Sequence, residues 1–202
     1  MHFLKNGKIS SAHNLSLYIN FYKNFQNLSV IQKLAKKIYG KISKKSFNSS
    51  YFAKPKKIGL ETKPHQDNAF FCMKPSEIMT FWFPVTFANK TNGGLYYYYG
   101  SHNSRLYEHE PKGNLGASMT IIPKELKIIK KKFKKIYINL KKGDFVVHSS
   151  NVVHGSNKNT SSFDRNAFNF SIASSRAKEI KKLKENYNSK LKKFLKFKKF
   201  VS

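Results

Sequence analysis

Cysteine, arginine and acidic residues are all scarce in this chain of 202 residues. Cys72 is the single cysteine, so an intrachain disulfide is excluded and a reducing compartment is allowed. No stretch approaches the roughly 20 apolar residues that span a bilayer, and the N-terminal region lacks the apolar core of a signal peptide. These absences lead us to expect a cytoplasmic protein without a transmembrane segment.

The shortage of acidic residues leaves the chain strongly basic. Asp and Glu number 10 against 39 Lys and Arg, which gives a net charge of +29. Only Arg105, Arg165 and Arg176 are arginine, and the other 36 basic residues are lysine. Arginine is the preferred side chain for guanine edges and for the planar phosphate fork. The composition therefore predicts weak attraction to anionic surfaces, and no specific nucleic-acid partner.

The rest of the composition describes a folded protein. Hydrophobic residues make up 40% of the chain and aromatic residues 15%, which fits a globular β-rich protein and excludes a disordered one. At this length the simplest organisation is one core with short appendages. We expect N-terminal helices and a linker over residues 1–53, the β core over 54–175, and a basic amphipathic tail over 176–202.

Short segments rich in aromatic and β-branched residues predict a mainly β fold. Turn signals separate several of them, namely Asn92-Gly93-Gly94 and Lys142-Gly143. Strands at this density are typical of a sandwich or an open barrel. The expected strands are His65–Cys72, Ile78–Phe87, Leu95–Tyr99, Ile136–Leu140, Asp144–His148 and Asn166–Ala173.

Four stretches outside these strands predict helix or loop. Apolar residues at three- and four-residue spacing over Leu15–Tyr39 predict helix. Residues 41–57 are polar and basic, and predict a loop. Residues 102–135 form a long excursion with a short helix from Pro123, a length typical of a lid or substrate loop. From Arg176 onward the spacing predicts a basic amphipathic helix that packs on the core, with membrane or partner contact as the alternative.

The candidate site begins with the run His65-Gln66-Asp67, which is followed far downstream by His154 and then Arg165. Two imidazoles and one carboxylate form the facial triad that binds non-haem Fe(II) and leaves coordination positions open. On a strand, His65 and Asp67 would point to the same face. The planar guanidinium of Arg165 could bind a carboxylate through two hydrogen bonds.

Other polar residues near this motif have competing interpretations. His148, six residues earlier, is the main rival of His154 as a metal ligand, but it ends a predicted strand, and only His154 has the Gly-Ser successor and the spacing to Arg165. His102 and Asp144 are expected to stabilise turns. Trp82 is expected to line the substrate pocket, with packing in the core as the alternative. The histidines without supporting context are His2, His13 and His109.

Further short runs surround these positions. They are Lys54-Pro55, His65-Gln66-Asp67-Asn68, Asn92-Gly93-Gly94-Leu95, Gly100-Ser101-His102, Gly143-Asp144, His154-Gly155-Ser156, Asn159 and Arg165. With them, the segment from Lys54 to Ile172 resembles the phytanoyl-CoA dioxygenase family of Fe(II)/2-oxoglutarate-dependent oxygenases. The resemblance covers a little over half of the chain. It departs from the usual family pattern at Tyr99, where a proline commonly precedes the glycine-serine-histidine run.

The resemblance implies a double-stranded β-helix, the jelly-roll fold also seen in cupins. It implies that His65, Asp67 and His154 bind iron, and that Arg165 binds the distal carboxylate of 2-oxoglutarate with Ser156 nearby. Such an enzyme uses O2, releases succinate and CO2, and hydroxylates a small or lipid-like organic substrate. A carboxylate at Asp67 favours oxygenation over halogenation, because related halogenases lack this ligand.

Two other classes of protein remain open from the sequence. One is a metal-binding β-helix protein without oxygenase activity, such as a cupin-like enzyme or a degenerate binding module. It would be favoured by a poorly formed site around Arg165. The other is a basic nucleic-acid-binding protein, for which the sequence offers charge but no recognised motif.

Overall fold

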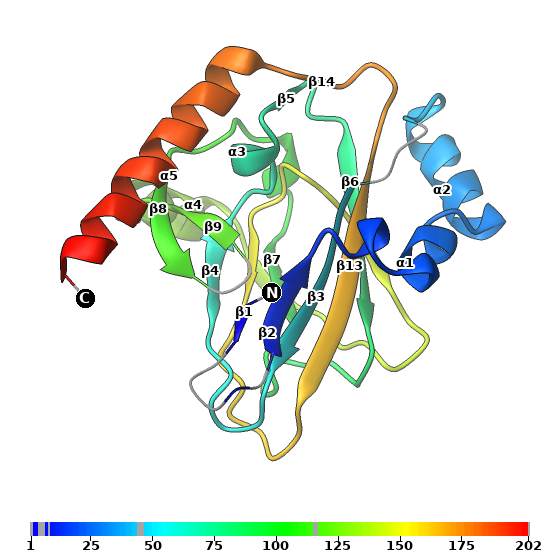
Figure 1. Cartoon of the computed structure of the whole chain (residues 1–202), viewed down its shortest axis with the longest axis horizontal. Coiled ribbons are helices and arrows are strands. Elements are labelled where there is room, and N and C mark those ends of the chain that lie inside the picture. Colours follow the sequence, from blue (N-terminus) through cyan, green and yellow to red (C-terminus); the bar gives the residue numbers. More distant parts are fainter. Residues whose placement is uncertain (1, 4–6, 8, 44–46, 115–116, 202) are drawn as a thin grey trace.

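Two antiparallel sheets dominate the computed structural model, which describes residues 2–3, 7, 9–43, 47–114 and 117–201 (Figure 1). The first sheet has six strands in the order β1-β2-β3-β13-β6-β11. Its strands are β1 (His2–Phe3), β2 (Ile9–His13), β3 (Phe47–Lys54), β6 (Ile78–Pro84), β11 (Val146–Ser149) and β13 (Arg165–Ala173). The second has four strands in the order β10-β7-β12-β4. They are β4 (Thr62–His65), β7 (Leu95–Tyr98), β10 (Lys135–Tyr137) and β12 (His154–Ser156).

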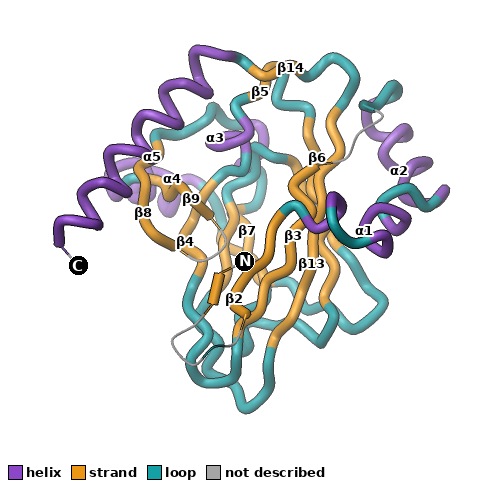
Figure 2. The backbone as a smooth tube through the Cα atoms, viewed as in Figure 1, coloured by secondary structure: helices purple, strands orange, loops and turns teal. Residues whose placement is uncertain are grey.

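Smaller elements connect and cover the two sheets (Figure 2). Two short ribbons pair β5 (Met73–Lys74) with β14 (Lys178–Glu179), and β8 (His109–Asn114) with β9 (Ala117–Ile121). The α-helices are α1 (Asn20–Phe25), α2 (Ser29–Tyr39), α3 (Asn68–Phe71), α4 (Pro123–Lys132) and α5 (Lys181–Val201). Two turns of 3-10 helix are η1 (Leu15–Leu17) and η2 (Ser101–Asn103). The fold is thus mainly β, as the strand-rich sequence predicts.

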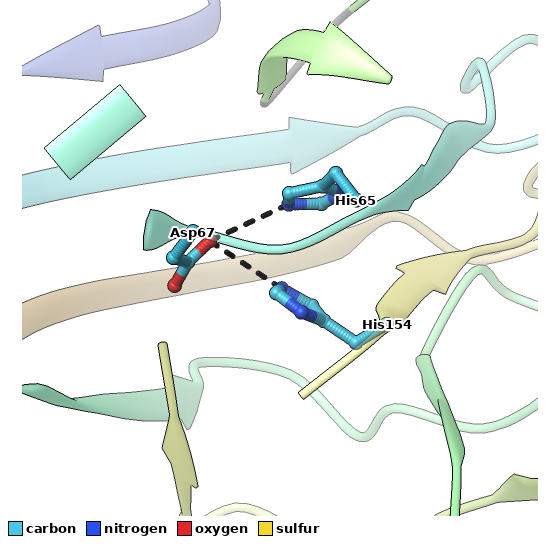
Figure 3. A group of neighbouring side chains, drawn as sticks. All are labelled: His65, Asp67 and His154. Carbon is cyan, nitrogen blue, oxygen red and sulfur yellow. Dashed lines mark ion pairs between the residues drawn. The ribbon is translucent and has the colours of Figure 1, made fainter. Parts of the chain in front are cut away.

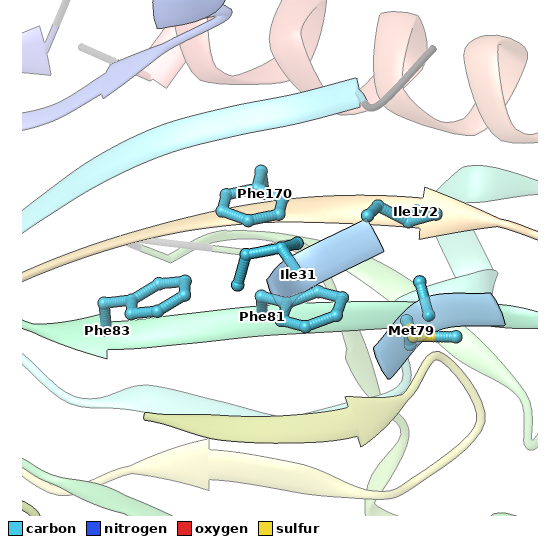
Figure 4. Close-up of a cluster of buried hydrophobic side chains, with 7 residues drawn as sticks. Ile31, Met79, Phe81, Phe83, Phe170 and Ile172 are labelled. Carbon is cyan, nitrogen blue, oxygen red and sulfur yellow. The ribbon is translucent and has the colours of Figure 1, made fainter. Parts of the chain in front are cut away.

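The outer face of the six-stranded sheet is apolar and lies under the N-terminal helices. Alternate residues of β6 and β13 point to this face, where Phe81 and Phe170 stack with ring centroids 5.3 Å apart. Ile31 of α2 is buried against these rings (Figure 4), and Ala35 of the same helix belongs to this cluster. The helical spacing of the apolar residues in α2 therefore has a direct cause, since one side of the helix covers the sheet.

The inner face of the same sheet looks toward the four-stranded sheet. One apolar cluster joins the two sheets, with Trp82 and Ala167 from the first and Leu95 and Tyr97 from the second. Elsewhere on the inner face of the six-stranded sheet, inward positions of β3, β6, β11 and β13 are polar and buried. They include Lys54, Thr80, His148, Arg165, Asn169 and Ser171. Burial of so many polar groups is costly unless they are hydrogen-bonded or bind a ligand, so this half of the interior is the candidate site.

The predicted loop over residues 41–57 is wrong, because it contains β3. This strand pairs with β2 on one side and β13 on the other. Its polar side chains are satisfied inside the protein: Ser49 Oγ donates to Ser16 Oγ at 2.8 Å, and Ser50 Oγ lies 2.9 Å from His13 Nδ1. Residues before 54 thus contribute strands to the core besides the predicted helices.

Two other predicted segments differ from the structure. The predicted strand over His65–Cys72 is wrong: β4 ends at His65, and the chain then turns into α3. The excursion over residues 102–135 contains the predicted helix from Pro123, but it also contains the β8–β9 ribbon. Both differences follow from tertiary contacts that local propensity does not report.

The basic C-terminal segment forms α5, which lies across β8 and α3 (Figure 1). Tyr187 Oη lies 2.9 Å from Ser118 Oγ of β9, and Lys184 Nζ donates to the carbonyl of Phe70 at 3.0 Å. The N-terminal part of α5 therefore packs on the core, as expected. Among the helices that the structure describes, none is long and apolar enough to cross a membrane.

Candidate functional site

His65, Asp67 and His154 meet between the two sheets (Figure 3). His65 ends β4 and pairs directly with His154 of β12, so their rings lie on one face with centroids 4.3 Å apart. Asp67 reaches the same point from the turn that begins α3, and not by alternation along a strand. Its Oδ1 lies 3.5 Å from His65 Nε2 and 3.7 Å from His154 Nε2. All three side chains are buried.

The hydrogen bonds of the two histidines prepare them to bind a metal. His65 Nδ1 lies 2.8 Å from the carbonyl of Lys63, and His154 Nδ1 lies 3.1 Å from the carbonyl of Val152. A carbonyl can only accept, so each Nδ1 carries a proton, and in the neutral ring Nε2 keeps the lone pair. Both Nε2 atoms face Asp67 Oδ1. Two imidazole nitrogens and one carboxylate oxygen at these separations fit a divalent metal ion.

The charge state of the cluster supports the same conclusion. Burial alone would raise the pKa of Asp67, but the imidazoles that surround its carboxylate, those of His154, His148 and His65, hold it well below its usual range. Burial, with the nearby His65, lowers the pKa of His154 well below its usual value. Asp67 is therefore ionised and His154 neutral at neutral pH, which are the forms that bind metal.

His148, the rival of His154 from the sequence, lies beside the cluster. Its Nε2 is 3.5 Å from Asp67 Oδ2, the carboxylate oxygen that also accepts a hydrogen bond from Thr80 Oγ1 at 2.9 Å. His154 remains buried in the group with His65. The structure thus brings both histidines to Asp67, one at each oxygen.

A part of the site that the sequence did not reveal holds the backbone between His65 and Asp67. The backbone N–H of Gln66 donates to His109 Nε2 at 3.1 Å, and His109 Nδ1 lies 2.8 Å from the carbonyl of Tyr107. The Gln66 side chain is fully buried and donates to the carbonyl of Asn151 at 2.7 Å. His109 therefore has a structural role beside the cluster, although its sequence context offered no sign of one.

Arg165 lies at the start of β13 with its guanidinium inside the protein, 3% exposed. Nη1 donates to the carbonyl of Phe52 at 3.4 Å, and Nε is buried without a partner among the described residues. Burial lowers its pKa to about 10, so it remains charged at neutral pH. The neighbouring Asp164 accepts a hydrogen bond from the backbone N–H of Lys56 at 2.8 Å.

The other two arginines behave differently. Arg105 contacts both carboxylate oxygens of Glu125 at 2.8 Å, and Arg176 pairs with Glu77. Both guanidiniums are largely exposed to solvent. Arg165 thus stands apart as a buried cation for which the described residues provide no carboxylate partner. An uncompensated buried charge is costly, and an anionic ligand would remove that cost.

A second buried basic side chain, that of Lys54, lies next to Arg165. Lys54 pairs directly with Arg165 across β3 and β13, and its Nζ donates to Ser156 Oγ at 2.5 Å and to the carbonyl of Asn157 at 2.7 Å. Burial, and the positive charge of Arg165, lower the pKa of Lys54 well below its usual value. Gly93 makes room for this side chain, since a Cβ there would lie 2.7 Å from Lys54 Cδ.

The remaining predicted site residues also have definite positions. Ser156 is buried on β12, two residues after His154, and contacts Lys54. Trp82 is buried between the sheets, and Arg165 Cζ lies 5.7 Å from its ring centroid. Its role as a substrate-pocket wall stays a prediction. Asp144 accepts from the backbone of Lys141, which fits the expected turn.

The fold and this donor set define a mainly β protein with a candidate mononuclear metal site beside two buried basic side chains, Lys54 and Arg165. The sequence profile of the phytanoyl-CoA dioxygenase (PhyH) family matches residues 1–167, so the chain belongs to that family. The chain is 32% identical over 168 residues to a phytanoyl-CoA dioxygenase domain-containing protein 1 of Danio rerio, covering 81% of this chain and 56% of that protein. A homologue from Dictyostelium discoideum is 31% identical over 149 residues and is covered to 52%. The chain thus spans about half the length of these relatives.

Solved structures share the fold. The apo form of EctD from S. alaskensis matches with a TM-score of 0.72 at 16% identity, over 86% of this chain and 60% of that one. SnoK, described as a non-heme alpha ketoglutarate dependent carbocyclase, matches with a TM-score of 0.70 at 19% identity, over 84% of this chain and 65% of that one. At these low sequence identities, the likeness shows a shared fold only.

Proposed function

We propose that this protein is an Fe(II)- and 2-oxoglutarate-dependent oxygenase whose two facing sheets form a double-stranded β-helix. The observation that carries the proposal is the pairing of a buried His65/Asp67/His154 cluster with the unpaired, buried Arg165. One feature provides metal ligands, and the other provides a place for an anion. Structural neighbours described with bound Fe or 2-oxoglutarate, including EctD from S. alaskensis, support this choice of ligands.

In this proposal His65, Asp67 and His154 would hold the iron through Nε2, a carboxylate oxygen and Nε2. Bound iron would supply the redox chemistry that couples the decarboxylation of 2-oxoglutarate with O2 to oxidation of the substrate, releasing succinate and CO2. The protein holds the ligands in one protonation state and excludes water from the reacting groups. The carboxylate at Asp67 takes the position that a halide would need, which favours oxygenation.

The buried cations would hold 2-oxoglutarate. A chain of contacts runs from His154 along β12 to Ser156, from Ser156 to Lys54, and from Lys54 across the sheet to Arg165. A dianion with carboxylates at both ends fits a site that has a metal at one end and a guanidinium at the other. Arg165 would bind the distal carboxylate in a planar two-pronged contact, with Ser156 beside it and Lys54 as a second positive charge.

We further propose that the reaction is hydroxylation of a small or lipid-like organic substrate. Trp82, beside Arg165, is our candidate for a wall of the substrate pocket. The alternative of a metal-binding β-helix protein without oxygenase activity predicts a poorly formed anion site. A buried, unpaired Arg165 with Lys54 opposite it favours the oxygenase instead.

The first prediction concerns Arg165. Replacing it with alanine should weaken 2-oxoglutarate binding by at least about tenfold, or roughly 1.4 kcal/mol, because the two-pronged carboxylate contact is lost. Binding of Fe(II) should survive, since the metal ligands are separate side chains. Anaerobic titration with 2-oxoglutarate in the presence of Fe(II) measures the first effect, and titration with Fe(II) alone measures the second.

Two further variants sharpen this test. Arg165→Lys keeps the charge but not the planar fork, so it should recover part of the affinity at most. Arg176→Ala is the matched control, because that arginine pairs with Glu77 at the surface and should leave 2-oxoglutarate affinity unchanged. Unchanged affinity in Arg165→Ala would refute the co-substrate site. A screen for succinate release over candidate substrates then tests the oxygenase reaction itself.

A further inference from the structure

We propose that His148 is a positioning residue for Asp67, and that Tyr97 selects the ring tautomer in which His148 does this. His148 would donate from Nε2 to Asp67 Oδ2, so that Oδ1 alone is left to face the metal. The inference rests on the proposed function, because it concerns the same metal site. It assigns a role to a histidine outside the His65/Asp67/His154 set.

The two oxygens of Asp67 have separate neighbours. Oδ1 faces Nε2 of His65 and Nε2 of His154, at 3.5 and 3.7 Å. Oδ2 accepts a hydrogen bond from Thr80 Oγ1 at 2.9 Å and faces His148 Nε2 at 3.5 Å. Histidine ligands thus gather at one oxygen and hydrogen-bond donors at the other. A carboxylate held this way presents one oxygen in a fixed direction, which is how groups behind a metal ligand orient it.

The position of His148 follows from the sheet. It pairs directly with Thr80 across β11 and β6, so both side chains point to the same inner face. Thr80 in turn lies opposite Ser171 of β13, with the two hydroxyl oxygens 2.9 Å apart. The back of Asp67 is therefore held by a row of side chains on one rigid sheet, whereas His65 and His154 come from the other sheet.

Tyr97 determines which nitrogen of His148 carries the proton. Its hydroxyl lies 2.9 Å from His148 Nδ1, and both groups are buried. Burial holds the pKa of Tyr97 well above its usual value, so the hydroxyl keeps its proton and can donate it. When Tyr97 donates to Nδ1, a neutral His148 carries its own proton on Nε2. That proton points at Asp67 Oδ2. In the other tautomer an unprotonated Nε2 would face the carboxylate, and the two groups would repel each other because both carry negative partial charge.

Packing alone does not account for this arrangement. His148 Nε2 is a buried polar atom that makes no hydrogen bond in the described part of the chain, which is costly for a group that serves only to fill space. A slight rotation of Asp67 as its Oδ1 turns to a metal would close the gap. A role for His148 as a fourth metal ligand is also disfavoured. His148 faces Oδ2 of Asp67, whereas His65 and His154 face Oδ1.

The test uses the whole protein and Co(II), whose visible spectrum reports the ligand set. His148→Phe removes the donor while keeping a ring in the cavity, and should weaken Co(II) binding by about 10- to 100-fold without changing the band positions of the bound form. His148→Gln keeps a donor near the place of Nε2 and should recover most of the loss. Tyr97→Phe should give an intermediate loss. His102→Phe, at an exposed position, is the matched control and should bind as the wild type does.

A second readout is independent of metal. In the metal-free protein, ¹⁵N NMR of the imidazoles should show His148 protonated on Nε2, and Tyr97→Phe should shift this signal toward a mixture of tautomers. This keeps the inference falsifiable if His148→Phe loses thermal stability.

Four outcomes would overturn the inference. They are equal Co(II) affinity in wild type and His148→Phe, a changed Co(II) band pattern in that variant (which would make His148 a ligand), no recovery in His148→Gln, and an Nδ1-protonated His148. Failure of the proposed function gives a distinct result, in which the wild-type protein itself binds no divalent metal. That result would overturn the inference as well.

Discussion

At the scale of single residues, protonation states in the interior are set by what each histidine nitrogen contacts. His65, His154 and His109 all place Nδ1 against a backbone carbonyl, so all three keep a bare Nε2. In the first two that nitrogen faces Asp67, and in His109 it accepts the N–H of Gln66. The same local device thus prepares two metal ligands and anchors the peptide between His65 and Asp67.

The second prediction concerns His109, whose pKa burial lowers from 6.5 to about 4. Between these values the unfolded chain takes up a proton that the folded protein does not, so stability should fall as the pH drops from about 6.5 toward 4. At about 1.4 kcal/mol per pKa unit, the contribution of His109 to this loss is roughly 3 kcal/mol. His109→Gln does not titrate and should lose less stability over that range.

Urea unfolding of the metal-free protein at pH 7 and pH 4 measures this effect. The comparison is between wild type and His109→Gln at each pH, because the other ionisable groups are common to both proteins and their contributions cancel. A glutamine oxygen can still accept from Gln66, so the variant keeps the hydrogen bond to the backbone. If the two proteins lose equal stability between pH 7 and pH 4, His109 does not titrate as its burial requires.

At the scale of elements, the sequence predicted the apolar strands and failed on those whose side chains are polar. β6, β7 and β13 were expected from their aromatic and β-branched residues. β3 was predicted as a loop because its serines, lysine and asparagine are polar, yet Ser49, Ser50 and Lys54 make hydrogen bonds to side chains in distant segments. A local sequence pattern indicates whether a side chain is polar. It does not indicate which hydrogen-bond partner the fold will place beside that side chain.

The candidate site shows the same limit. The sequence identified the residues that converge, namely His65, Asp67 and His154. It did not predict which backbone element positions Asp67. It arrives through the turn into α3, whereas alternation along one strand was expected. The parts that orient these side chains, namely His109 and the pair Tyr97 and His148, act through contacts at sequence separations of more than 40 residues. Spacing within a motif carries no information about such contacts.

The third prediction concerns the helix that covers the outer face. Ile31 of α2 is 2% exposed and contacts the aromatic side chains of β6 and β13. Ile31→Ala should lower the free energy of unfolding by about 2–5 kcal/mol, because it removes buried apolar contacts and leaves a cavity. Val30→Ala, one residue earlier and 62% exposed, should change it by less than about 0.5 kcal/mol. Chemical unfolding of both variants tests whether α2 is an integral part of the core, and equal effects would show that it is not.

At the scale of the whole molecule, charge and chemistry are separated in space. Most of the net charge of +29 is carried by exposed lysines, many of them on α4 and α5. The cations of the candidate site, Lys54 and Arg165, lie inside and touch polar groups of the two sheets. Surface lysines can attract anions of any kind, whereas the interior pair is placed to distinguish one anion by its shape.

The last prediction follows from the surface charge. The protein should bind DNA weakly and without sequence preference, because lysines neutralise phosphates but the described structure offers no element arranged to read base edges. If about three phosphates are neutralised, affinity should fall roughly 40-fold between 50 and 200 mM salt. Fluorescence anisotropy with two duplexes of unrelated sequence measures both features, and 2-oxoglutarate titrations in the same buffers give the comparison. The interior Arg165 site is shielded from the ions that screen the surface, so its affinity should change far less than that for DNA. Sequence-dependent DNA binding, or an equal salt response at both sites, would contradict this separation of surface and interior charge.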